Sequence, residues 1–133
     1  MSNKLEIYKS LAIEASQQAY IPYSDYAVGA VLVASDGEQL FTGCNVENAS
    51  YPASICAERT ALVKAVSEGV RDFSKVIVAT KNGGSPCGIC RQMLYEFSPS
   101  LQVVCITFDG DVTIDKPLHD LLADGFGPTS LNT

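Results

Sequence analysis

Two cysteines with metal-ligand spacing are the feature of this sequence that most directly suggests chemistry. Cys87 and Cys90 are separated by two residues, follow Pro86 and begin a segment, residues 87–97, with the composition of a helix. Residues three apart on a helix lie on one face, so both thiols can reach the same ion. The free N–H groups and the positive dipole end at a helix start also favour the thiolate, which is the metal-binding form.

Cys56 can supply a third thiolate, because it stands at the start of a second expected helix, residues 56–68. Two helix starts that converge on one point would place three thiolates around a soft, tetrahedral ion such as zinc. Structural zinc sites use four protein ligands, whereas catalytic sites keep one position for water. Glu58 follows Cys56 by two residues and is not an obvious ligand, so it can take a proton from such a water and return it.

The remaining candidates for a fourth ligand have simpler interpretations. Cys105 lies in the apolar run 103–108 and Cys44 closes a predicted strand, so we expect both to be packing residues. His119, the only histidine, lies in a late amphipathic segment and is expected at the surface. Two alternatives stay open on these residues alone. The cysteine pair can be a redox pair, and Glu58 can be a carboxylate that the helix dipole favours.

The composition limits the class of partner. The 133 residues are enough for one domain, residues 1–133. Nine basic against fifteen acidic residues give a net charge of −6, and no Lys/Arg run is present, which argues against nucleic acid or an anionic membrane. No apolar run is long enough for a secretory peptide or a membrane span, so we expect a cytoplasmic protein. Five cysteines, an odd number, are then not expected to form a disulfide framework.

The positions of apolar residues predict an α/β fold. An apolar stripe with spacings of three and four runs along a first helix that ends before Ile21-Pro22. Strands are predicted at 26–34, 40–46, 75–80, 101–108 and 112–114, and helices at 56–68, 87–97 and 117–123. Asp36-Gly37 and Asp109-Gly110 predict hairpins, and the helices between strands predict right-handed crossovers. We therefore expect a three-layer α-β-α domain with a mixed five-stranded sheet.

Four segments, in this order, resemble one known family. They are YSDYAVGAVL (23–32), GCNVENASYP (43–52), ICAERTAL (55–62) and SPCGICRQML (85–94). Cys-Ala-Glu followed by Pro-Cys-x-x-Cys is similar to the cysteine-ligand version of the zinc deaminase signature. From about residue 8 to residue 128 the chain resembles the small homotetrameric cytidine deaminases, which implies a cytidine deaminase-like fold and one zinc per subunit. The implied activity is hydrolytic deamination of cytidine and 2′-deoxycytidine in pyrimidine salvage, with release of ammonia.

The resemblance also implies a role for each matching residue. Zinc would be held by Cys56, Cys87 and Cys90, and Glu58 would carry the protons. The implied substrate-binding residues are Asn45 and Glu47 for the ribose, Tyr26 for stacking on the base, the Ala57 N–H, the Ser85 carbonyl, and Phe126 reaching a neighbouring subunit's site.

Two features bear on these roles: the net charge of a zinc site with three thiolates, and the tyrosine at position 26. Three thiolates on Zn²⁺ leave a formal charge of −1, and Arg59 is placed to offset it by donating to sulfur. Tyr26 stands where the family usually has phenylalanine, so its hydroxyl needs a partner if it is buried.

Three alternatives are weighed against this interpretation. Deaminases of nucleic-acid bases need a basic channel, and they typically place a helix between their last two strands. The charge of −6 and the Asp109-Gly110 hairpin argue against them. A blasticidin-type nucleoside antibiotic deaminase is the nearest enzyme alternative, but the Asn45/Glu47 pair favours a ribonucleoside. A non-catalytic zinc-binding module would leave Glu58 without a purpose.

Overall fold

A five-stranded sheet is the framework of the structure, a computed structural model in which residues 3–131 are described. The strands are β1 (Gly29–Ala34), β2 (Leu40–Cys44), β3 (Phe73–Thr80), β4 (Gln102–Thr107) and β5 (Val112–Pro117). Their order in the sheet is β2-β1-β3-β4-β5. Only the β3–β4 pair is parallel, so the sheet is mixed, as predicted.

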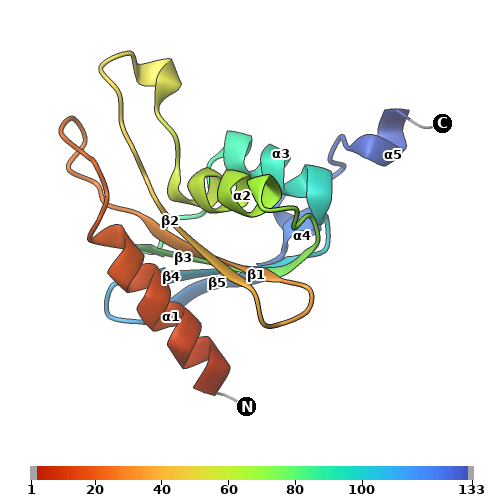
Figure 1. Cartoon of the computed structure of the whole chain (residues 1–133), viewed down its shortest axis with the longest axis horizontal. Helices are drawn as coiled ribbons and strands as arrows, with labels where there is room; N and C mark the ends of the chain where they lie inside the picture. The colour runs from red at the N-terminus through yellow and green to blue at the C-terminus, as the bar shows by residue number, and fades with distance from the viewer. Residues whose placement is uncertain (1–2, 132–133) are drawn as a thin grey trace.

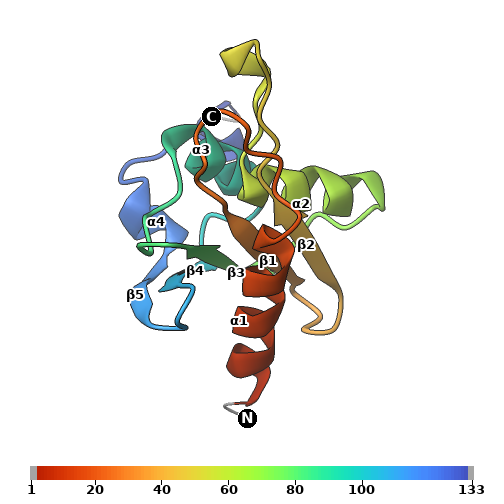
Figure 2. The same cartoon turned by 90° about the vertical axis from the view of Figure 1, so that its left-hand side faces the viewer.

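Helices cover both faces of this sheet. They are α1 (Asn3–Ser16), α2 (Ala57–Ser67), α3 (Gly88–Phe97), α4 (Leu118–Leu121) and α5 (Pro128–Leu131), with a 3₁₀ turn η1 (Tyr51–Ala53). Figure 1 shows α1 on one face and α2 with α3 on the other, and the side view in Figure 2 agrees. The predicted three-layer architecture is therefore confirmed. None of the described helices is long and apolar enough to cross a membrane.

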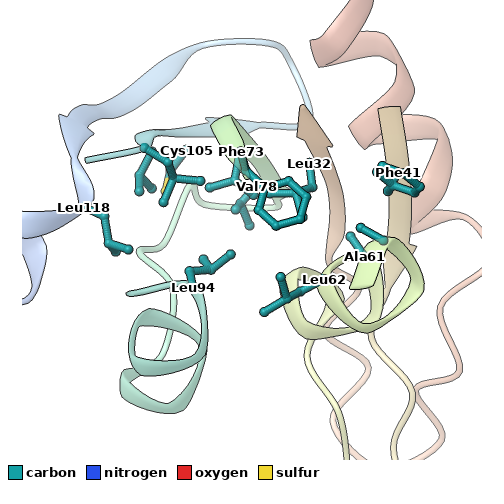
Figure 3. Close-up of a cluster of buried hydrophobic side chains, with 13 residues drawn as sticks. Leu32, Phe41, Ala61, Leu62, Phe73, Val78, Leu94, Cys105 and Leu118 are labelled. Atoms are coloured by element: carbon teal, nitrogen blue, oxygen red, sulfur yellow. The ribbon is translucent and has the colours of Figure 1, made fainter. Parts of the chain in front are cut away.

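Two apolar cores hold the layers together. The larger lies between the sheet and α2 and α3, where Leu32 and Val78 of the strands meet Leu62 and Leu94 of the helices (Figure 3). The smaller lies under α1 and includes Tyr8. All six residues of β1 are buried because both faces of this strand are covered, which explains its continuous apolar sequence.

The connections after β2 and β3 bring two helix starts to the same end of the sheet, where both strands terminate. β2 and β3 both run antiparallel to β1, so they are parallel to one another. The chain leaves the carboxyl end of β2 to reach α2, and the carboxyl end of β3 to reach α3. In open α/β sheets, ligands bind in the crevice beyond the carboxyl ends of the strands.

The observed element ends differ from the predicted ones in a few places. β1 begins at Gly29, three residues late, because the backbone of residues 26–28 bonds to the Asn45 side chain instead. α1 ends at Ser16, ahead of the predicted end before Ile21. β5 extends to Pro117, which pairs with Gln102. The tail after α4, which we did not predict to be helical, contains α5.

Two glycines let helices rest directly on the sheet backbone. A Cβ atom on Gly29 would lie 1.9 Å from the carbonyl oxygen of Ala12 in α1. A Cβ atom on Gly43 would lie 2.4 Å from the carbonyl oxygen of Ala57, the first residue of α2. Gly43 therefore sets how closely the first turn of α2 approaches the sheet.

We expect Gly43→Ala to destabilise the fold by about 1–3 kcal/mol, because the added methyl overpacks a rigid backbone contact. The urea midpoint of unfolding, followed by circular dichroism, measures this change. Gly88→Ala is the control, since a Cβ atom there meets nothing within 4 Å. Equal midpoints for the two variants would show that Gly43 does not set the helix position.

Candidate metal and substrate site

The three predicted thiols meet at the starts of two helices. Cys56 is the N-cap of α2, and Cys87 is the N-cap of α3, where its sulfur accepts a hydrogen bond from the Cys90 N–H at 3.5 Å. The Cys56 and Cys87 sulfurs are 3.6 Å apart, and those of Cys87 and Cys90 are 3.2 Å apart. All three sulfurs lie within 4.8 Å of one another.

These separations fit a zinc ion. Zn–S bonds of about 2.3 Å at tetrahedral angles place sulfur atoms about 3.8 Å apart, whereas a disulfide requires about 2.05 Å. Cys105 is fully buried in the core, Cys44 ends β2, and neither belongs to the cluster. The exposed His119 contacts the Asp120 carboxylate. The cluster thus offers three thiol ligands and leaves a fourth coordination position for water.

The surroundings of Cys56 favour its thiolate. Hydrogen bonds from Cys90, Arg59 and Cys87 lower the pKa of Cys56 to about 5 against the opposing effect of burial. The same cluster raises the pKa of Cys90 through its hydrogen bond to Cys56 and through burial. Arg59 Nη2 lies 3.5 Å from the Cys56 sulfur and 3.4 Å from the Ser54 carbonyl oxygen. The contact between Arg59 and a ligand sulfur is therefore present.

Glu58 is a buried carboxyl group without a partner for one of its oxygens. Its exposed fraction is 3%, and no hydrogen bond reaches Oε1. Burial raises the pKa of Glu58 to about 7, and the negative charge of Cys56 adds to this effect. Buried polar atoms are nearly always hydrogen-bonded, so an unpaired carboxylate oxygen needs a functional explanation. A pKa near neutrality suits a group that both accepts and donates protons.

A cavity of about 460 Å³ brings most of the predicted residues together. Five of those lining it were predicted from the sequence to contact substrate or protons: Tyr26, Asn45, Glu47, Glu58 and Ser85. Cys56 and Cys87 also line it, and Ala57 is fully buried at the first position of α2. Phe126 does not line this cavity, and its exposed fraction is 57%.

The Asn45 and Glu47 side chains hold the loop before β1. The Asn45 amide donates to the Tyr26 carbonyl oxygen at 2.9 Å and accepts from the Val28 N–H at 2.9 Å. The Glu47 carboxylate accepts from the Ser24 hydroxyl and from two backbone N–H groups, at 3.0 and 3.1 Å. The Ser24 hydroxyl bond lowers the pKa of Glu47, so this side chain is a fixed anion at the cavity wall.

Sequence reasoning missed the residues that shape the loop between β3 and α3. Arg91 donates to the Pro86 carbonyl at 2.8 Å, the Leu121 carbonyl at 2.9 Å and the Ser85 hydroxyl at 3.3 Å. Thr80 Oγ1 accepts from the N–H groups that follow it in this loop. The only sequence signal for Arg91 was a charged residue directly after the Cys-x-x-Cys pair. Asn82, an exposed residue of this loop, carried no sequence signal.

Comparisons with known proteins agree with this geometry. The family described as "Cytidine and deoxycytidylate deaminase zinc-binding region" matches residues 2–107. A cytidine deaminase of Sporosarcina psychrophila is 48% identical over 122 residues, which are 90% of this chain and 88% of that protein. The crystal structure of cytidine deaminase from Burkholderia pseudomallei has 44% identity and a TM-score of 0.85, covering 91% of this chain and 98% of that one.

A second solved structure is more distant in sequence but shares the fold. Cytidine deaminase from Mycobacterium tuberculosis is 36% identical, with a TM-score of 0.79 over 92% of this chain and 96% of that one. The family match contains all three clustered cysteines and the buried Glu58. With its sheet order, its thiol cluster and its sequence in agreement, the chain belongs to the cytidine and deoxycytidylate deaminase family.

Proposed function

We propose that this protein hydrolyses cytidine and 2′-deoxycytidine to uridine and 2′-deoxyuridine, with release of ammonia. The observation that carries this proposal is the buried Glu58 carboxyl, with one oxygen unpaired, in the same cavity as Cys56 and Cys87 of the three-thiol cluster. Relatives named cytidine deaminase, similar to this chain over most of its length, support the substrate. Zinc bound by Cys56, Cys87 and Cys90 would make hydroxide available near neutral pH by lowering the pKa of a water molecule.

Glu58 is the proton carrier of the proposed reaction. Its carboxylate takes a proton from the attacking water and delivers it to N3 of the base. The hydroxyl added at C4 then gives its proton through Glu58 to the amino group, which leaves as ammonia while the C4 carbonyl forms. The oxygen of water thus replaces the amino nitrogen at C4, and no oxidant or further reactant is needed. The pKa of about 7 allows Glu58 to serve in both directions.

Other residues bind the substrate in this proposal. The Ala57 N–H, free at the start of α2, donates to the base O2. The Ser85 carbonyl accepts from the amino group, and Tyr26 stacks on the ring. Asn45 and Glu47 reach the ribose hydroxyls from the cavity wall. Arg59 offsets the excess negative charge of three thiolates on one zinc ion.

A cytoplasmic homotetramer with composite sites is part of the same proposal. Phe126 is exposed and does not line the cavity of its own chain, and the Gln92 side chain donates to its carbonyl oxygen at 2.8 Å. Its segment, with α5, projects from the body of the molecule (Figure 1). Tyr51 is also exposed, at 70%, which suits a residue that packs against a neighbouring copy.

Glu58→Gln should lower kcat for cytidine by about a hundredfold or more, because an amide cannot carry the protons. The loss of absorbance as cytidine becomes uridine measures the rate. Glu68→Gln, at the opposite end of α2, is the control and should react like the wild type. Wild-type turnover in the Glu58 variant would contradict this mechanism. A wild-type chain that binds zinc yet leaves cytidine unchanged would instead indicate a non-catalytic zinc-binding module.

Cys87→Ser should abolish stable zinc binding, because only two thiol ligands remain. Metal analysis of the purified protein should find one zinc per wild-type chain and almost none in this variant. Cys44→Ser is the matched control, since this half-buried cysteine lies outside the cluster. Equal zinc content in the two variants would exclude Cys87 as a ligand.

Phe126→Ala should raise KM for cytidine by about tenfold without dissociating the oligomer, because one aromatic contact to the base region is lost. Sedimentation velocity should give the mass of four chains for the wild type and for this variant. Val112→Ala removes an exposed apolar side chain elsewhere and serves as the control. A fully active monomer would contradict the composite site.

A further inference from the structure

We propose that Asn82 is a positioning residue: its hydrogen bond to Tyr26, called the latch below, holds the Tyr26 ring and so fixes the cavity wall against which the base binds. The inference rests on the proposed function for its substrate. Tyr26 O–H donates to Asn82 Oδ1 at 2.5 Å, and the two residues are 56 positions apart in the chain. Asn82 is thus the hydrogen-bond partner of the hydroxyl group that distinguishes Tyr26 from phenylalanine.

The acceptor belongs to a small hydrogen-bond network. Thr80 Oγ1 donates to the same Asn82 oxygen at 3.3 Å. Thr80 Oγ1 also accepts from the N–H groups of Gly83 at 2.7 Å and Gly84 at 3.1 Å. Because Thr80 ends β3 and is 3% exposed, the network connects the Tyr26 hydroxyl to the rigid sheet.

The bond joins two loops that both contribute residues to the cavity. Tyr26 belongs to the loop before β1, which Asn45 and Glu47 hold, whereas Asn82 belongs to the loop between β3 and α3. Tyr26, Thr80 and Gly84 all line the cavity. Asn82 itself is exposed and does not line it, so Asn82 acts on the substrate only through Tyr26.

The latch affects binding and not the chemical step. The groups that carry the reaction, Glu58 and the three thiols, lie in the first turns of α2 and α3 or at their N-caps, and they make no bond with Tyr26 or Asn82 among those described. Without the latch, the Tyr26 ring has more orientations in the free enzyme, and substrate must select one of them. The apparent affinity for the substrate therefore decreases in proportion to the fraction of free enzyme that is competent to bind it.

Steady-state kinetics with cytidine test the latch. Tyr26→Phe and Asn82→Ala should each raise KM by about three- to tenfold, the effect of one net hydrogen bond, and leave kcat within twofold. The double variant should raise KM no more than either single variant, because both remove the same bond. Asn82→Asp keeps an acceptor oxygen at this position and should retain a KM near that of the wild type.

Tyr20→Phe is the matched control, because it removes the hydroxyl of an exposed tyrosine outside the cavity and should change neither constant. Circular dichroism and zinc content establish that each variant is folded and loaded. The latch is contradicted by an unchanged KM in Tyr26→Phe or Asn82→Ala, by effects that multiply in the double variant, or by Asn82→Asp behaving like Asn82→Ala. A wild-type chain without cytidine turnover contradicts the proposed function instead.

Discussion

The distance between two helix starts is the constraint on which the whole site depends. Cys56 caps α2 and Cys87 caps α3, 31 positions apart in the chain, and their sulfurs lie 3.6 Å apart. Neither helix sets this distance alone. It follows from the parallel course of β2 and β3 and from the contact of α2 with the sheet at Gly43. The larger core then fixes α3 through Leu94.

Burial of Glu58 is possible because this framework is rigid. A change in pKa from its ordinary 4.5 to about 7 corresponds to a preference for the neutral carboxyl of about 3 kcal/mol. That is a large share of the 5–15 kcal/mol by which domains of this kind are typically stable. This unfavourable free energy of burying Glu58 is retained because α2 rests on the sheet backbone at Gly43, which keeps the helix from turning Glu58 outward. The same constraint that assembles the thiols therefore keeps Glu58, the proposed proton carrier, buried at the cavity wall.

The fold, the thiol cluster and much of the cavity lining could be predicted from local patterns and from the family resemblance, whereas the contacts that join the loops around the cavity could not. Cys56 and Cys87 precede segments with helix-forming composition, and β3 contains the apolar run 76–79. The sequence therefore identifies both the helix starts and the buried strand. Arg91 and Asn82 give no comparable signal. Their partners Leu121 and Tyr26 are 30 and 56 positions away, and an exposed asparagine in a loop has no preferred role. Such contacts become visible only when the topology has placed distant loops side by side.

The loop before β1 shows how the cavity can be both a binding site and part of the fold. The Asn45 side chain makes two hydrogen bonds and the Glu47 carboxylate makes three with residues 23–28, yet both line the cavity. The Glu47 carboxylate still has lone pairs, and the Asn45 amide still has one N–H. A ribose that bonds to this N–H and these lone pairs would further restrain the Asn45 and Glu47 side chains, which already hold the loop that contains Tyr26. The loop is thus ordered before the substrate arrives, which lowers the entropy lost on binding.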